Sequence, residues 1–139
     1  MFRNLAILSI AAAVAAHVGN AEAYPQFLKA FRAEYLDGNE NEDFTKLAKK
    51  AKCMICHAAK EDNPKKYNAK EHNPYGQKVD DLLGKGDRKD ADKISKALQK
   101  IAEMPSREAK DGESEGDIPT FGELIEAGKL PGGDLPGGD

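Results

Sequence analysis

Apolar residues recur at helical spacing in five segments after residue 23, and no segment alternates apolar and polar residues in the manner of a strand. The five segments lie at 25–36, 40–52, 74–83, 90–103 and 120–127. Pro74 stands at a helix start, and Gly84 and Gly128 stand just past helix ends, where each residue type is favoured. The pattern predicts an all-α fold, a small domain whose helices gather around the turn at residues 53–57.

A different pattern occupies the first 23 residues. Arg3 precedes a nearly uninterrupted apolar run at residues 5–16, and Ala21-Glu22-Ala23 offers small residues at the two positions that a signal peptidase reads. An uncleaved membrane anchor would need about 20 apolar residues, and this run is shorter. We therefore predict a signal peptide at residues 1–23, removed before Tyr24, and a mature protein exported to the bacterial periplasm without membrane insertion.

The mature part of the chain divides into three sections. Residues 24–38 form an N-terminal helix, residues 39–128 form the main domain, and residues 129–139 form a tail rich in Gly and Pro. Within the main domain, residues 106–118 are charged and contain Gly, which is typical of a flexible linker. The tail contains Leu-Pro-Gly-Gly-Asp twice, too short a repeat for a solenoid, so we expect a disordered or loosely docked end.

The residues that carry chemistry form one motif, Cys53-Met54-Ile55-Cys56-His57, which matches the C-x-x-C-H pattern of covalent haem attachment. On a helical turn, positions i, i+3 and i+4 project from one face. Two thiols so placed can form thioethers with the two vinyl groups of one haem, while the histidine binds the iron. A neutral imidazole suits this role because one nitrogen binds the metal and the other N–H donates to an orienting acceptor.

Three other interpretations of the two cysteines compete with haem attachment. They could form a structural disulfide in an oxidising compartment. They could form a thioredoxin-like redox pair, which requires a βαβ context that the sequence does not predict. They could bind zinc with His57 and His72, although adjacent Cys56 and His57 are not a usual zinc pair. The export signal, the helix leading into the motif and the absence of any other cysteine favour haem.

With this motif, the sequence resembles the monohaem c-type cytochromes, in their small class I-like exported form. The resemblance rests on residues 53–57, on Asn73-Pro74-Tyr75-Gly76 and on the later amphipathic helices, and it covers most of residues 39–127. It implies a helical domain wrapped around one covalent haem c, with Cys53 and Cys56 as thioether residues and His57 as the proximal iron ligand. It also implies that the Pro74 carbonyl accepts the His57 N–H.

The distal iron ligand stays open at this point. In the family a methionine followed by a proline often occupies the distal position, and Met104-Pro105 is similar. A thioether ligand there would raise the reduction potential. His72 is the rival, although it directly precedes the segment expected to brace His57 and so starts on the proximal side. The third alternative is an open or water-filled position.

Charge and composition narrow the range of possible functions further. Residues 46–100 contain 15 Lys and Arg against 8 Asp and Glu, whereas residues 101–139 contain 3 against 10. The lysines near the motif could steer an acidic redox partner, or they could simply form a solvated surface. The net charge of −3, without aromatic residues interleaved among the basic ones, argues against nucleic-acid binding.

The sequence contains neither clustered carboxylates nor a nucleophile paired with a base, so we predict a carrier rather than an enzyme. The expected function is soluble, periplasmic electron transfer through one haem. Two alternatives remain: a haem protein that binds or senses gases at an open distal site, and a haem subunit of a larger redox complex.

Overall fold

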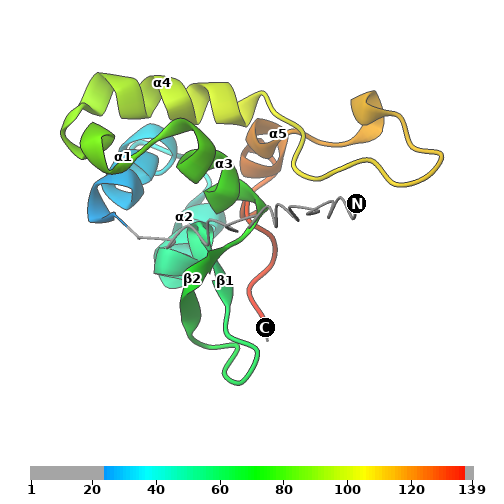
Figure 1. The fold of residues 1–139 in the computed structure, drawn as a ribbon, viewed down its shortest axis with the longest axis horizontal. Coiled ribbons are helices and arrows are strands. Elements are labelled where there is room, and N and C mark those ends of the chain that lie inside the picture. The colour runs from blue at the N-terminus through cyan, green and yellow to red at the C-terminus, as the bar shows by residue number, and fades with distance from the viewer. Residues whose placement is uncertain (1–23, 137–139) are drawn as a thin grey trace, which may run out of the picture.

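The computed structural model describes residues 24–136, so the predicted signal peptide lies outside the described residues. The elements in chain order are α1 (Pro25–Tyr35), α2 (Glu42–Ala51), η1 (Lys52–Ile55), β1 (His57–Ala59), β2 (Tyr67–His72), α3 (Pro74–Leu82), η2 (Lys85–Lys89), α4 (Ala91–Ala102), η3 (Glu115–Asp117) and α5 (Phe121–Glu126), where η denotes a short 3-10 turn. Helix α4 runs along one side of the molecule above α1 and α3, and the β1–β2 hairpin projects from the opposite side (Figure 1). None of the helices in the described range is long and apolar enough to cross a membrane.

The five predicted helices are all present, and local sequence explains where they begin. The side chain of Asp90 caps α4 by accepting from the Lys93 N–H at 2.9 Å. Thr120 and Glu123 form a reciprocal capping box at the start of α5. Pro74 occupies the first turn of α3, where its missing N–H costs nothing. These signals are local, which is why they could be read from the sequence.

Side chains from all five helices form the core. Phe31 of α1, Tyr75 of α3 and Phe121 of α5 are almost fully buried, and the Tyr75 ring lies edge-on to the other two with centroids 5.8 and 5.3 Å apart. Such pairs contribute about 0.5–1.5 kcal/mol each beyond their burial. Helix α2 adds Phe44, which is equally buried. This cluster fixes the position of α3 and therefore the positions of the residues that α3 contributes to the candidate site.

The expected all-α fold is wrong, because β1 and β2 pair as a two-stranded antiparallel sheet. His57 lies opposite His72 and Ala59 lies opposite Tyr67, with a register irregularity between the two pairs. Helical periodicity could not reveal this sheet because β1 has three residues and β2, Tyr-Asn-Ala-Lys-Glu-His, is polar and mostly exposed on both faces. Backbone hydrogen bonds rather than an apolar face hold the hairpin together, so the fold is mixed α/β.

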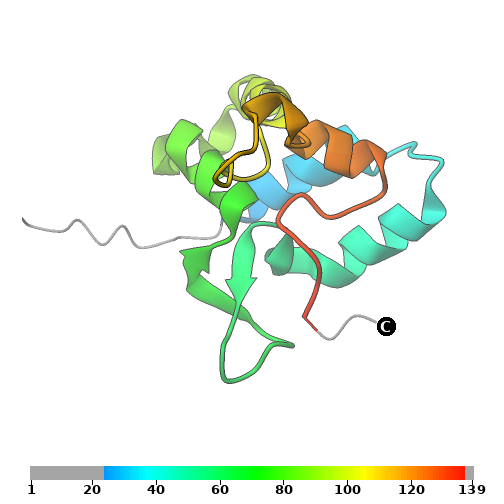
Figure 2. The same cartoon turned by 90° about the vertical axis from the view of Figure 1, so that its right-hand side faces the viewer.

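Two segments expected to be loose show defined structure. Residues 106–118 extend away from the helices (Figure 1), and Arg107 forms two hydrogen bonds to the Glu113 carboxylate at 2.6 and 2.8 Å. The tail returns past α2 towards the hairpin (Figure 2). Leu130, only 2% exposed, anchors the start of this tail in the core.

Candidate functional site

An apolar cavity of about 230 Å³ lies between the start of α1, the Cys53–His57 motif, β2 and α3. The side chains of Cys53, Cys56 and His57 all line it. Phe27 and Leu28 contribute apolar walls from α1, and the first turns of α3 close the other side. The cavity therefore gathers both thiols and the imidazole of the motif around one space.

The motif does not form the continuous helical turn that its spacing suggested. Helix α2 ends at Ala51, and Lys52 then adopts a left-handed conformation with φ of +50°. The 3-10 turn η1 follows, closed by a hydrogen bond from the Cys56 N–H to the Cys53 carbonyl at 3.3 Å, and His57 already belongs to β1. A non-glycine residue in this region costs about 1–3 kcal/mol and is typical of functional sites. The positive φ of Lys52 lets the chain change direction between the end of α2 and the β1–β2 hairpin.

His57 is buried and its imidazole contacts the backbone of β2. The residue is 3% exposed, and its Nδ1 lies 3.2 Å from the carbonyl oxygen of Glu71 on β2. In the tautomer that has its hydrogen on Nδ1, the ring donates to this carbonyl, and Nε2 then has the lone pair that could bind a metal. Burial lowers the pKa of His57, and nearby His72 lowers it further, while backbone hydrogen bonds partly offset both effects. Glu71 thus takes the bracing role that the resemblance implied for Pro74.

The two cysteines are free thiols rather than a disulfide. Burial raises the pKa of Cys56 to about 12, and the neighbouring Cys53 thiol adds to the shift. A thioredoxin-like redox pair depends on the opposite effect, a depressed thiol pKa that supplies a thiolate. The hairpin and 3-10 turn around the motif also differ from the βαβ unit of that class. Both observations weigh against a redox-active dithiol.

Asn73 ties the motif to α3, a role that the sequence alone did not indicate. Its Nδ2 donates to the carbonyls of Met54 and Ile55 at 2.9 and 3.0 Å, and its Oδ1 accepts from the Gly76 N–H at 2.9 Å. Its backbone N–H donates to the Cys56 carbonyl at 3.0 Å. Asn73 is 8% exposed, so losing these bonds would leave buried polar groups unpaired.

Gly76 allows α3 to approach the motif closely. A Cβ at this position would overlap the carbonyl group of Cys56. Glycine is favoured wherever backbones must approach this closely. The Asn-Pro-Tyr-Gly segment therefore attaches α3 to the motif in two ways: Asn73 forms hydrogen bonds to the motif, and Gly76 leaves room for the Cys56 carbonyl.

The candidate distal ligands lie in different places. His72 lines the cavity, and its ring centroid is 4.9 Å from that of His57. Met104 is half-buried just past the end of α4, where its carbonyl accepts from the Phe121 N–H at 3.0 Å, and it is not among the residues lining the cavity. The structure therefore brings His72, but not Met104, to the space that the motif faces.

The zinc hypothesis needs four converging donors. Among residues 24–136, the structure contains no group of three or more His, Cys, Asp or Glu side chains placed to hold a metal ion. The two cysteines and two histidines line one cavity without closing on a common point. This arrangement differs from the compact tetrahedral geometry of a structural zinc site.

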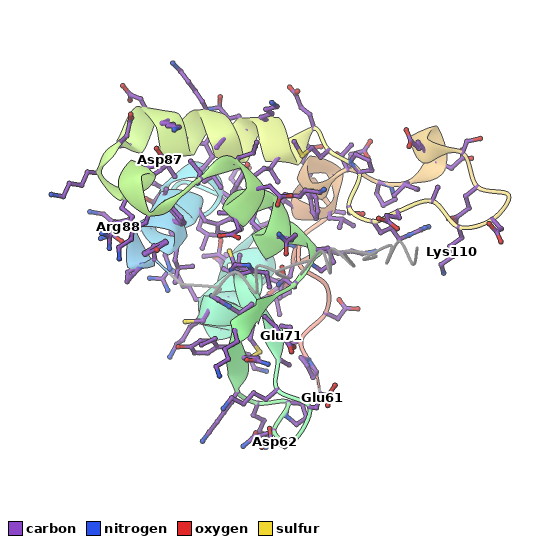
Figure 3. All side chains as sticks on the ribbon, in the orientation of Figure 1. Glu61, Asp62, Glu71, Asp87, Arg88 and Lys110 are labelled. Atoms are coloured by element: carbon purple, nitrogen blue, oxygen red, sulfur yellow. The ribbon has the colours of Figure 1, made fainter. Side chains whose placement is uncertain are left out.

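A basic groove of about 630 Å³ adjoins the cavity and shares Cys53 and Tyr67 with it. Six lysines line this groove: Lys50, Lys52, Lys60, Lys65, Lys66 and Lys70. The glutamate and aspartate at positions 61 and 62 lie at the far tip of the hairpin (Figure 3). The surface beside the motif is therefore positively charged, and a surface of this kind attracts acidic proteins.

No protein-family model matches the chain, and no curated protein or solved structure is significantly similar to it. The resemblance to small class I-like cytochromes c therefore stays a prediction from the motif. The function has to be argued from the residues around the cavity.

Proposed function

We propose that the protein is an exported c-type cytochrome that carries single electrons in the periplasm. One haem would be bound covalently through Cys53 and Cys56, with His57 as an axial ligand. The observation that supports this most strongly is that Cys53, Cys56 and His57 all line one apolar cavity. When bound, the haem supplies reversible one-electron chemistry at its iron.

The residues around the cavity suit such a group chemically. The thiols are free to form thioethers, and the Glu71 carbonyl leaves Nε2 of His57 available to a metal. Pockets that enclose a drug-sized ligand measure about 300–1,000 Å³. At about 230 Å³, this cavity would leave part of a macrocycle outside the protein. An exposed edge of that kind lets a partner protein approach closely for electron transfer.

The lysine-lined groove supports an acidic redox partner. The groove shares Cys53 with the cavity, so a partner that docks there lies next to the attachment site. Attraction between exposed charges accelerates association and weakens with salt. We expect the rate of electron exchange with an acidic carrier to fall as ionic strength rises, and to fall more steeply than with a neutral carrier.

One observation favours gas binding as a second candidate function. No methionine lines the cavity, so the thioether ligand expected from the sequence lies elsewhere in this structure. A site without a second protein ligand would bind carbon monoxide in the ferrous state. Carbon monoxide titration of the untreated reduced protein separates this function from electron transfer, because a filled sixth position resists the ligand.

The proposed function is tested by producing the full chain in a host that exports and matures c-type cytochromes. The denatured protein should keep its haem through acid–acetone extraction, and potentiometry should give one reversible one-electron wave. Cys53→Ala and Cys56→Ala should each weaken or abolish stable haem retention. Met54→Ala, which changes the same motif without removing a thiol, should retain the haem. Haem that extracts freely from the unaltered protein would contradict the proposal.

A further inference from the structure

Two oppositely charged surfaces lie well apart on the described part of the chain. The basic groove lies between the end of α2 and the β1–β2 hairpin, and the extended segment at residues 106–118 projects beyond the end of α4. The extended segment contains five Asp and Glu against two Lys and Arg, a balance of −3. Figures 1 and 2 both show the segment and the hairpin apart, so the two surfaces do not meet within one copy.

The six lysines of the basic groove have no acidic partner within the described molecule. Among residues 24–136, the basic members of ion pairs are Lys46, Lys78, Lys93 and Arg107, and none of these lines the groove. All six groove lysines are exposed. A cluster of like charges raises the potential of a surface and attracts an oppositely charged one. The groove is therefore available to an acidic segment of another molecule.

Most acidic side chains of the extended segment are also unpaired. The Glu113 carboxylate is the exception, because it pairs with Arg107. The other four carboxylates are exposed and form no ion pair within the part of the chain that the structure describes: Glu108, Asp111, Glu115 and Asp117. The segment thus presents unneutralised negative charge to the solvent.

Hydrogen bonds give the extended segment a defined shape. At its base, the Ser106 N–H donates to the Pro119 carbonyl at 3.0 Å. Near its middle, the Glu113 carboxylate accepts hydrogen bonds from the Arg107 guanidinium and from the Lys110 N–H. A loop that is already ordered loses less conformational freedom on binding. The segment is therefore prepared to dock as it stands.

We propose that the extended segment of one copy docks in the basic groove of a second copy, so that the protein associates head to tail. A contact between two different surfaces of identical chains leaves one surface of each kind unoccupied, so it continues into a chain or closes into a ring. The groove shares Cys53 with the cavity, so an occupied groove excludes an acidic redox partner from the attachment site. That competition rests on the proposed haem function, whereas the association itself does not.

Sedimentation velocity of the exported, haem-matured protein tests the association. At about 0.01 M salt the Debye length is about 30 Å, and the weight-average mass should rise with protein concentration. At about 1 M salt the Debye length is about 3 Å, and the protein should sediment as a monomer. A protein that stays monomeric at low salt, or that associates equally at both salt concentrations, would overturn the inference.

Charge reversal on each surface tests where the copies meet. The groove variant combines Lys65→Glu with Lys66→Glu, and the segment variant combines Asp111→Lys with Glu115→Lys. In either variant alone, the dissociation constant at low salt should rise at least about tenfold, because like charges then face each other at the contact. Unchanged association of either variant would overturn the inference.

A matched control separates the contact from a general effect of net charge. Lys96→Glu with Lys100→Glu changes the net charge as much as the groove variant does, but on an exposed face of α4. This control should associate as the unaltered protein does. A loss of association equal to that of the groove variant would overturn the inference.

Mixing the groove variant with the segment variant gives the sharpest test. The unaltered segment of the first fits the unaltered groove of the second, whereas the two altered surfaces are both left with a net positive charge. We therefore expect a complex of one copy of each, without growth beyond two chains. A mixture that stays monomeric would overturn the inference.

Mass spectrometry of the same samples separates this inference from the proposed function. Monomeric protein with covalent haem overturns the association and leaves the proposed function standing. Salt-sensitive association of protein that lacks covalent haem supports the association and overturns the proposed function.

Discussion

The motif region and the extended segment at residues 106–118 both contain little helix or strand, but different kinds of contact hold their backbones in place. Around the motif, Asn73 donates three hydrogen bonds to backbone carbonyls and accepts one from the Gly76 N–H, and α3 approaches the motif closely at Gly76. In the extended segment, the contact between Arg107 and Glu113 is exposed, and a Cβ added at Gly116 would meet open space. The comparison indicates that the backbone is held most firmly around Cys53, Cys56 and His57, the candidate functional residues.

Matched glycine substitutions should separate the two regions most clearly. Gly76→Ala forces a Cβ against the Cys56 carbonyl, and we expect the free energy of unfolding to fall by about 1–3 kcal/mol or more. The Cβ added by Gly116→Ala has no atom within 4 Å, so this substitution should change the free energy of unfolding by less than about 0.5 kcal/mol. Urea unfolding of the purified proteins measures both values. Equal stability of the two variants would show that the motif region tolerates movement.

Asn73 should be the next most sensitive position. Asn73→Ala leaves the part-buried carbonyl of Met54 and the buried carbonyl of Ile55 without their donor, and we expect the free energy of unfolding to fall by about 1–3 kcal/mol in total. Asn73→Asp keeps an acceptor for the Gly76 N–H but turns a negative oxygen towards both carbonyls, so it should not restore stability. Urea unfolding of both variants tests this. Wild-type stability in Asn73→Asp would show that the two donated bonds contribute little.

The smallest effect is expected at the Arg107–Glu113 pair in the extended segment. The hydrogen bonds from Arg107 and from the Lys110 N–H lower the pKa of Glu113 to about 2 from its usual 4.5. Because the folded pKa is depressed, any stabilisation by this carboxylate is fully present above pH 4.5 and is lost as the pH falls towards 2. Both side chains are solvent-accessible, so global stability should hardly respond.

Nuclear magnetic resonance titration of the Glu113 carboxyl carbon measures that pKa. The midpoint should lie near 2 in the unaltered protein and should move towards the ordinary value in Arg107→Ala. A normal midpoint in the unaltered protein would show that residues 106–118 behave as the flexible linker expected from their composition.

Local signals made much of the fold predictable. Helix starts such as Thr120–Glu123 depend on neighbours three residues apart, and the apolar face of α4 repeats at helical spacing. The hairpin was missed because its strands pair across an intervening loop and carry no alternating apolar face. The sequence left open whether the tail is disordered or loosely docked, because a single apolar residue such as Leu130 in a Gly-rich tail has no periodicity to reveal its burial.

The sequence indicated the two cysteines and the histidine of the candidate site but not the residues that contact them. The spacing of Cys53, Cys56 and His57 is fixed by the chemistry of attachment and can be read directly from the sequence. The partners of these residues are set by tertiary contacts. Glu71 reaches His57 through its backbone carbonyl, which any residue type can supply. Asn73 reaches Met54 through its side-chain amide, but the two residues are 19 positions apart, so the sequence pattern gives little indication of either contact.

The central claim is that one haem is joined to both Cys53 and Cys56, and peptide mapping of the exported protein tests it most directly. Trypsin cleaves after Lys52 and Lys60, so the motif is released as the peptide 53–60. The account predicts that mass spectrometry finds this peptide with the mass of one haem added and no free thiol. Recovery of the peptide from haem-matured protein with both thiols free, or with the two cysteines joined as a disulfide, would contradict the account.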